Sequence, residues 1–308
     1  MNEADSSAMP PAEVSRCGQV AIVGRPNVGK STLLNHLVGM KLAATTRRPH
    51  TTRNRILGVV TEGSDQLIFI DTPGIDFSAR QLLARTMTRT ALATVQDIDV
   101  VLLLVEAGQW QDGDARILER LKTLQCPLVL AINKVDRLKD RTALLPYIDQ
   151  VKDLHPFAAV VPISGLKGDN LDALKQVLMQ ALPEGEHQFD DEQITDRSER
   201  FFVTEIVREK LMDQLGDEVP YAASVQVDEF QDVNGRAEIV ATIWVERESQ
   251  KAIVVGKQGR RIKAIGMAAR QDIERLLERR VDLRLWVRHK ENWQDTIASI
   301  AAMGVDVE

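Results

Sequence analysis

The chain has 308 residues, of which 44% are hydrophobic and 27% are charged, and its formal net charge is −6. This length exceeds that of one typical domain and predicts two. The negative balance excludes a protein that is basic over its whole surface, although a basic patch on one domain stays compatible with it. No apolar run approaches the roughly 20 residues of a membrane-spanning helix. Cys17 and Cys126 lack the spacing of a metal site or a disulfide framework, so we expect a soluble intracellular protein with reduced thiols.

Residues 1–16 are polar and lack the basic start and apolar core of a signal peptide, so we expect a disordered extension. From residue 17 to residue 182, short apolar runs alternate with stretches of helical spacing. The runs predict strands at Val20–Val23, Leu67–Ile70, Val100–Val105, Leu128–Ile132 and Val160–Ile163. The stretches predict helices at Ala79–Val95, Asp114–Leu124 and Asn170–Leu182. This order is typical of a doubly wound α/β domain with a mostly parallel sheet.

The order of elements changes after residues 183–198, an acidic and turn-rich segment that we interpret as the interdomain linker. Residues 199–308 form the second predicted domain. Its expected helices are Glu199–Leu215, a short one near Gln250–Val254, and a long one from Arg260 to about Glu278. Its expected strands are Ser224–Phe230, Glu238–Val245 and Val281–Val287. This α-β-β-α-α-β order is that of a type II KH domain, an α+β fold.

The phosphate loop, Gly24–Ser31, reads GRPNVGKS and matches G-x-x-x-x-G-K-[ST] between a predicted strand and a predicted helix. Its glycines let backbone N–H groups turn toward phosphates, and the helix N-terminus adds its dipole. We expect Lys30 to reach the β- and γ-phosphates and the Ser31 hydroxyl to ligate Mg²⁺. The alternative is an ordinary glycine turn, which the strand–loop–helix context disfavours.

Two further segments are expected to complete the phosphate and metal site. Asp71–Gly74 (DTPG) follows a predicted strand, where its aspartate can hold Mg²⁺ through a water and its glycine N–H can face the γ-phosphate. The switch segment, Lys41–Arg55, is rich in Thr and Arg and lies where a GTPase must supply a threonine to Mg²⁺. We expect Thr52 in that role, with Thr51 as the close alternative. Such a segment is ordered by the triphosphate and released on hydrolysis.

Guanine specificity is expected from Asn133–Asp136 (NKVD), which follows another predicted strand. The Asp136 carboxylate can accept two hydrogen bonds from guanine. Adenine lacks that donor pair and would leave the carboxylate desolvated and unpaired, so GTP rather than ATP is the expected substrate. Ser164-Gly165 follows the last strand, where the Gly165 N–H is expected to contact the guanine oxygen.

Ile75 follows DTPG at the place where many GTPases carry a glutamine that orients the attacking water. An aliphatic side chain cannot do this, so we expect slow intrinsic hydrolysis that needs a partner, another group or a cation. Asn27 in the phosphate loop is a candidate for holding a monovalent cation such as K⁺, and a role as a turn residue is equally compatible with its position.

The predicted site residues can be grouped by role. The predicted nucleotide-binding residues are Gly24, Arg25, Pro26, Asn27, Val28, Gly29, Lys30, Ser31, Thr32, Asp71, Thr72, Pro73, Gly74, Asn133, Lys134, Val135, Asp136, Ile163, Ser164 and Gly165. Those expected to act in hydrolysis are Lys30, Thr52, Asp71 and Gly74. Those expected to hold Mg²⁺ are Ser31, Thr52 and, through a water, Asp71.

The second domain carries a GXXG sequence, Gly256–Gly259 (GKQG), between two predicted helices. KH domains clamp a nucleic-acid backbone with such a loop, although an isolated GXXG is often only a tight turn. Residues 251–263 contain five basic side chains and no acidic one, which is the charge pattern of a phosphate-binding surface. The predicted RNA-binding residues are Gly256, Lys257, Gln258, Gly259, Arg260, Arg261 and Lys263.

Taken together, these motifs resemble the Era family of bacterial GTPases over roughly residues 17 to 304. In the first half the shared sequences are GRPNVGKSTLLN (Gly24–Asn35), HTTR (His50–Arg53), DTPG and NKVD. In the second half they are ITDRSERF (Ile194–Phe201), REKL (Arg208–Leu211), VERE (Val245–Glu248) and GKQGRRIKAIG (Gly256–Gly266). The chain departs from the family pattern at His50, where Gln is usual, and at Gly165, where Ala is usual.

The resemblance implies a Mg²⁺-dependent GTPase that binds GTP and GDP, and 16S rRNA near its 3′ end. It implies help in 30S subunit assembly and rRNA maturation, with a link to cell growth and division. It also implies a monomer in the cytoplasm, with a fraction peripheral at the inner membrane.

Other classes of protein would need different second halves. A GTPase of tRNA modification, another RNA-linked switch or a metal transporter could share the first half. The first and the last of these would require a different C-terminal domain or transmembrane helices. A non-hydrolysing scaffold could dispense with Lys30 and Asp71, and both are present.

Overall fold

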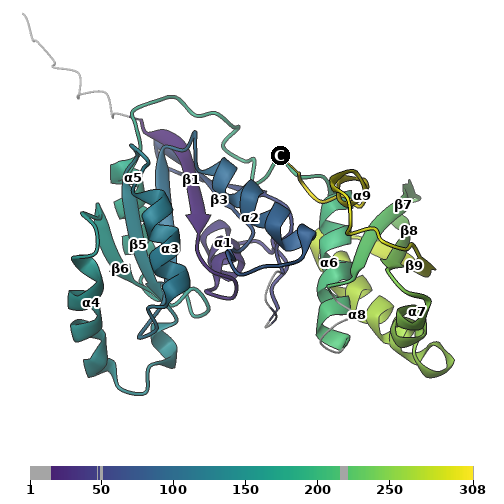
Figure 1. The fold of residues 1–308 in the computed structure, drawn as a ribbon. Helices are drawn as coiled ribbons and strands as arrows, with labels where there is room; N and C mark the ends of the chain where they lie inside the picture. Colours follow the sequence, from purple (N-terminus) through teal and green to yellow (C-terminus); the bar gives the residue numbers. More distant parts are fainter. Residues whose placement is uncertain (1–14, 47, 49–50, 216–220, 308) are drawn as a thin grey trace, which may run out of the picture.

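The structure is a computed structural model that describes residues 15–46, 48, 51–215 and 221–307, and it contains two domains joined by one connecting segment (Figure 1). The first domain is built on a six-stranded sheet of order β2-β3-β1-β4-β5-β6. Its strands are β1 (Cys17–Val23), β2 (Ile56–Glu62), β3 (Asp65–Asp71), β4 (Val100–Glu106), β5 (Leu128–Asn133) and β6 (Ala159–Pro162). All neighbouring pairs are parallel except β2 with β3. The carboxyl ends of β1, β3, β5 and β6 therefore meet at one edge.

Helices cover both faces of this sheet, which explains the uninterrupted apolar strands. One face packs against α1 (Lys30–Val38) and α5 (Leu171–Ala181). The other packs against α2 (Leu82–Thr94), α3 (Asp112–Leu121) and α4 (Leu144–Lys152). Short 3₁₀ turns lie at Val135–Arg137 and Arg141–Ala143. The predicted doubly wound α/β fold is confirmed, and the five predicted strands and three predicted helices are all present.

Strand β2 and helix α4 were not predicted from the sequence. A glycine, Gly58, interrupts the apolar run of β2, and it is needed there because a Cβ would lie 2.7 Å from Val38 Cγ2. The two-residue turn at residues 63–64, which begins with a glycine, is the signal that could have revealed the β2–β3 hairpin. Helix α4 carries Pro146, which is tolerated because it lies in the first turn.

The second domain has the predicted type II KH order. Helix α6 (Glu199–Gln214), β7 (Ala223–Val233), β8 (Arg236–Val245), α7 (Glu248–Val255), a 3₁₀ turn at Lys257–Gly259, α8 (Arg260–Leu277) and β9 (Arg280–His289) follow one another. The sheet order is β7-β8-β9, with β7 antiparallel and β9 parallel to β8. The helices pack on one face of this sheet around a single apolar core.

The connecting segment, residues 183–198, lies along β2 and β3 rather than crossing free space. The backbone N–H of Val59 donates to the carbonyl of Ile194 at 2.8 Å, and the Thr195 hydroxyl donates to the carbonyl of Leu57 at 2.7 Å. The Gln66 side chain accepts from the N–H groups of residues 188 and 189. Ser15 and Arg16, the last residues of the predicted N-terminal extension, also contact this segment, whereas residues 1–14 lie outside the described residues.

The chain continues beyond β9 into a C-terminal segment, residues 290–307, that returns to the first domain. It contains α9 (Ile297–Ala302), which contacts α2 (Figure 1). Buried side chains of this segment pack with side chains of α2 in one cluster, which comprises Leu83, Met87, Trp293, Ile300, Met303 and Val305. Asn54 and Asp306 hold the same interface, since the backbone N–H of Asp306 donates to Asn54 Oδ1 at 2.9 Å. Helix α9 was not predicted from the sequence.

Candidate nucleotide and RNA sites

The phosphate loop wraps the junction of β1 and α1. Gly29 has a φ of 105°, and a Cβ there would lie 2.4 Å from Asn133 Nδ2, so only glycine fits. Lys30 is 6% exposed, and its Nζ donates to the carbonyl oxygens of Gly24 at 3.1 Å and Arg25 at 3.0 Å. Burial lowers the pKa of Lys30 to about 8. The ammonium group therefore lies folded over the loop, where anionic phosphates can contact it.

Three oxygen-bearing side chains from separate elements meet beside Lys30. Ser31 Oγ, at the start of α1, lies 2.6 Å from Thr52 Oγ1 and donates to Asp71 Oδ2 at 2.7 Å. Thr52 Oγ1 is also 3.4 Å from Asp71 Oδ2. Thr51 instead bonds Thr46 Oγ1 and the carbonyl of residue 48, both at 2.8 Å. The geometry thus brings together Thr52, not Thr51, with the other two predicted metal ligands.

Asp71 offers a direct test of whether a cation fits. Its carboxylate is fully buried, and among the described residues its Oδ1 has no hydrogen-bond partner. Burial raises the pKa of Asp71 to about 6, although nearby Lys30 opposes this rise. An unpaired buried carboxylate oxygen costs free energy unless a cation or its bound water satisfies it. Two hydroxyls and one carboxylate form the hard oxygen set that suits Mg²⁺.

The guanine-side motif is held in place from both ends. Asn133 Nδ2 donates to the carbonyl of Val28 at 2.8 Å, which ties β5 to the phosphate loop. Asp136 Oδ1 accepts from Ser164 Oγ at 2.6 Å, which aims the carboxylate. The Gly165 N–H donates to Asn133 Oδ1 at 2.9 Å. The predicted contact of this N–H with a guanine oxygen would have to be made in addition to that bond or in its place.

Ile75 is 2% exposed and packs in the apolar core beneath the sheet, so its side chain does not face the phosphate site. The interpretation that Ile75 cannot orient a water therefore rests on its position as well as its chemistry.

The Arg25 side chain, although part of the phosphate loop, turns away from the phosphate site. Its Nε forms an ion pair with buried Asp114 at 2.7 Å. That pair anchors the loop to α3 and was not predicted from the sequence.

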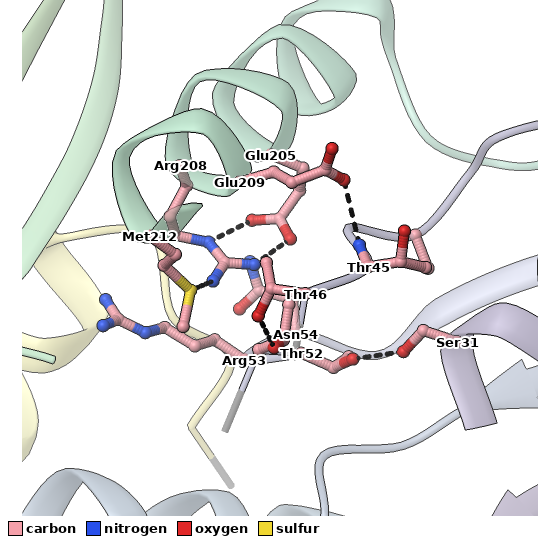
Figure 2. Close-up of polar contacts among 12 residues, drawn as sticks. Ser31, Thr45, Thr46, Thr52, Arg53, Asn54, Glu205, Arg208, Glu209 and Met212 are labelled. Atoms are coloured by element: carbon pink, nitrogen blue, oxygen red, sulfur yellow. Dashed lines mark hydrogen bonds and ion pairs between the residues drawn. The ribbon is translucent and has the colours of Figure 1, made fainter. Parts of the chain in front are cut away.

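The switch segment is fixed by the second domain as well as by the site (Figure 2). Glu209 of α6 accepts from the backbone N–H of Thr45 at 2.9 Å and pairs with Lys41 at 2.7 Å. Arg53 is 3% exposed and donates to the carbonyl oxygens of Tyr221 and Ala223 at 3.2 and 2.8 Å. These contacts hold the residues on both sides of the Thr45–Thr52 stretch. These contacts were not predicted from the sequence, because Glu209 and Arg53 each bond a partner that is distant in the chain.

The GXXG loop presents the predicted RNA-binding side chains to solvent. Gly256 has a φ of 70°, and a Cβ there would lie 2.7 Å from Arg261 Cβ, so glycine is required at this turn. Lys257, Gln258 and Arg260 are exposed, as is Lys263 on the first turns of α8. Arg261 is held by a 2.6 Å hydrogen bond from its guanidinium to the carbonyl of Ile253.

A hollow of about 280 Å³ lies between β9 and α8, the helix that follows this loop. Its lining combines aliphatic and basic side chains: Ile262, Lys263, Met267 and Arg270 from α8, with Leu283 and Leu285 from β9. Met267 is 51% exposed. An apolar floor with a basic rim can accept unstacked bases while phosphates lie against the loop. Val254, by contrast, is fully buried in the core.

Comparison with known proteins finds a family match for each of the two domains. A model of 50S ribosome-binding GTPases matches residues 19–134, and a KH-domain model matches residues 218–294. GTPase Era of Pseudomonas aeruginosa is 49% identical over 290 residues, which are 94% of this chain and 95% of that protein. The chain belongs to the Era family. GTPase Era of Ectopseudomonas mendocina is 47% identical over 296 residues, 96% of this chain and 99% of that protein.

Solved Era structures share the whole fold. Aquifex aeolicus Era bound to GDP·AlF₄⁻ superposes with a TM-score of 0.90 at 39% identity, over 94% of this chain and 99% of that one. Era in complex with MgGDPNP and nucleotides 1506–1542 of 16S ribosomal RNA gives a TM-score of 0.91 at 39% identity, over the same shares. The chain is therefore an Era-type GTPase with a C-terminal KH domain, as the sequence predicts.

The chain departs from the usual Era sequence at two positions, His50 and Gly165. His50, where the family usually has Gln, lies outside the described residues. Gly165, where Ala is usual, packs against the Asn133 side chain, with an added Cβ lying 3.4 Å from Asn133 Oδ1. Within the described part of the chain, no helix is both long and apolar enough to cross a membrane.

Proposed function

We propose that this Era GTPase binds 16S rRNA near its 3′ end through its KH domain and assists assembly and rRNA maturation of the small ribosomal subunit. The observation that carries the proposal is the exposed GXXG loop with its basic rim, on a chain whose GTP site packs against the same domain. A structurally similar Era was solved with nucleotides 1506–1542 of 16S ribosomal RNA. A role in tRNA modification has no corresponding observation.

We assign the nucleotide to the edge formed by the phosphate loop, DTPG and NKVD. In this assignment Lys30 contacts the terminal phosphates, the Gly74 N–H faces the γ-phosphate, and Asp136 binds guanine. Ser31 and Thr52, with Asp71 through a water, would hold Mg²⁺, and the ion would neutralise charge that develops on the phosphates. The support is the 2.6 Å Ser31–Thr52 approach and the unpartnered Asp71 oxygen. The MgGDPNP of the related Era complex is consistent with this metal.

The proposal extends to partners and location. GTP or GDP, 16S rRNA and the 30S subunit are the expected partners, with K⁺ as a candidate second cation beside Asn27. A monomeric state, a cytoplasmic location and a fraction peripheral at the inner membrane are further predictions that follow from family resemblance. A link between assembly and cell growth or division rests on the same resemblance.

Co-sedimentation of the full chain with small ribosomal subunits tests the proposal. We expect binding with a GTP analogue that exceeds binding with GDP, and a fall as salt rises because phosphate contacts release counterions. The double substitution Lys257→Asp with Gln258→Asp places two carboxylates beside the phosphates and keeps both glycines. It should abolish binding to subunits and to a single-stranded RNA with the sequence of the 16S 3′ end.

The matched control is Lys122→Asp with Gln125→Asp, which makes the same charge change on the exposed far side of the GTPase domain. It should leave RNA binding intact. Both double variants should retain GTP affinity, because neither site touches the nucleotide edge. RNA binding that survives the GXXG substitutions would place the RNA site elsewhere and contradict the proposal.

A further inference from the structure

The three-stranded sheet of the KH domain is covered by helices on one face only. Alternate residues of β8 and β9 enter the core, and those between them face outward. In the parallel register, Val240 lies beside Arg284, Thr242 beside Trp286, and Trp244 beside Arg288. Trp286 is 58% exposed, which is unusual for so large an apolar ring.

The C-terminal segment covers only one end of this outer face. Trp244 packs against the cluster that contains Trp293 and Ile300, and the Ser224 hydroxyl donates to the carbonyl of Met303 at 3.1 Å. Trp286 is not part of that cluster. The chain's own covering therefore stops one position short of it.

The β9 edge of the uncovered face is basic. Outward positions of β9 carry three arginines (Arg280, Arg284 and Arg288) and one acid (Asp282). The rest of the face is balanced or acidic: β8 adds Arg236 and Glu238, and β7 adds Glu229 opposite Val240 and Asp228, which accepts from the Thr242 hydroxyl at 2.6 Å. Arg284 lies 3.3 Å from Asp282, and both side chains are exposed, so this ion pair is weak. Within residues 221–307, the structure gives Arg288 no ion-pair partner. The positive excess along β9 contrasts with the net charge of −6 for the whole chain.

The face is also continuous with the groove between α8 and β9. Leu283 and Leu285 line that groove, and Arg284 and Trp286 lie on the opposite face of the same strand. Strand β9 is the edge of the sheet, so no further strand separates the two surfaces. A second hollow of about 670 Å³ lies at the α8–β9 turn and shares Arg270 with the groove, and its lining mixes basic with acidic side chains (Arg236, Arg279 and Arg280 with Glu274 and Glu278).

We propose that the outer face of β9 is a second RNA contact, which binds nucleotides next to those held in the groove. One base stacks on Trp286, and the neighbouring phosphates lie against Arg284 and Arg288. This inference rests on the proposed RNA-binding function. Aromatic rings flanked by guanidinium groups bind single strands in this way without reading their sequence. A protein partner would need a larger apolar centre than one tryptophan beside half-buried Val240.

The test compares RNAs of two lengths on the full chain. A short RNA of about four nucleotides fills the clamp of a KH loop, and longer RNAs extend it on the 5′ or the 3′ side. We expect Trp286→Ala to lower affinity for one extended RNA by about fivefold or more, the usual effect of losing one stacked base, and to leave the short RNA unaffected. Trp286→Phe should restore most of this affinity because it keeps a ring. Replacing both Arg284 and Arg288 by Gln should reduce the salt slope for that RNA by about 1.4, the value for two single-strand phosphates.

Leu145→Ala is the matched control, since Leu145 is 70% exposed on the far helix α4 and should not affect RNA binding. Two failures can be told apart. If the GXXG double substitution leaves short-RNA affinity unchanged, the proposed function itself is wrong. If that substitution abolishes binding while Trp286→Ala changes neither extended RNA, only the second contact is overturned, and the face is left to another partner such as an acidic protein surface.

Discussion

Thr52 and Arg53 are consecutive in the chain, yet their side chains enter different domains. The Thr52 hydroxyl lies 2.6 Å from the Ser31 hydroxyl in the nucleotide site (Figure 2). The Arg53 guanidinium instead donates to the carbonyl of Ala223 at the start of β7. Arg53 also lies over the ring of Trp293 at 5.9 Å. A conformation of this dipeptide that satisfies one domain therefore constrains the other, which gives the switch segment a physical link to the KH domain.

We predict that Arg53→Met reduces the preference for a GTP analogue over GDP. The substitution keeps aliphatic volume but removes the bonds that hold Thr52 toward Ser31, and GDP gains less from Thr52 because it lacks the γ-phosphate. The affinity ratio should fall about fivefold or more, within the usual coupling range of about 1–3 kcal/mol. Equilibrium titration with fluorescent analogues of both nucleotides measures it.

Arg55→Ala is the control for this prediction, because the Arg55 side chain is exposed and the residue is held through its backbone. Its N–H donates to Asp306 of the C-terminal segment, and its carbonyl accepts from Arg197 of the connecting segment. It should leave the ratio unchanged. Equal losses of both affinities in Arg53→Met, or a collapse of its thermal unfolding transition, would show that Arg53 supports the fold and not the link.

The nucleotide edge could be predicted from sequence, because its motifs are contiguous and each follows a strand. Thr52 could not be separated from Thr51 in that way, since the choice depends on which hydroxyl the folded switch segment turns toward Ser31. The contacts of Arg53 and Glu209 join residues more than 160 positions apart and carry no local pattern. The packing of Trp293 on α2 was hidden for the same reason.

We predict that Asp136→Asn weakens guanine binding and favours xanthine nucleotides. The carboxylate accepts from two guanine donors, and hydrogen bonds to a charged group contribute about 1.5–3 kcal/mol each. Loss of both should lower GTP affinity about a hundredfold or more. The amide can still accept from Ser164 Oγ, which bonds Asp136 at 2.6 Å, so the loop should keep its shape. Competition by GTP, XTP and ATP measures the change, and equal competition by ATP in the unmutated protein would refute guanine specificity.

We predict that the gain in GTP affinity on adding Mg²⁺ declines as pH falls through about 6. Burial raises the pKa of Asp71 to about 6, so below this value the free protein carries a neutral carboxyl that does not attract the cation. Protons and Mg²⁺ then compete, and the metal-dependent part of binding is lost at low pH and fully present above the pKa. Asp71→Asn should remove both the gain and this pH dependence.

The terminal phosphate of the nucleotide also titrates near pH 6, so the measurement must compare the two proteins rather than use one curve. The difference between the curves of the unmutated chain and Asp71→Asn isolates the contribution of Asp71. Identical curves would mean that this carboxylate does not contribute to metal binding.

We predict that the isolated protein hydrolyses GTP slowly, and that Ile75→Gln does not accelerate it. Ile75 is 2% exposed, so a glutamine there would be buried in the apolar core and would lower stability, by about 1–3 kcal/mol for an unsatisfied amide. Lys30→Ala should lower the rate about 10²-fold or more, as expected for removal of a group that stabilises charge on the phosphates.

We predict that K⁺ stimulates hydrolysis by the unmutated protein more than Na⁺ does. Asn27→Gly tests that last point, because Asn27 has a φ of 64° and glycine keeps the turn while removing the side chain. We expect it to abolish the difference between K⁺ and Na⁺; an unchanged difference would assign Asn27 to the turn alone, and a fast rate without RNA, ribosome or K⁺ would contradict the role given to Ile75.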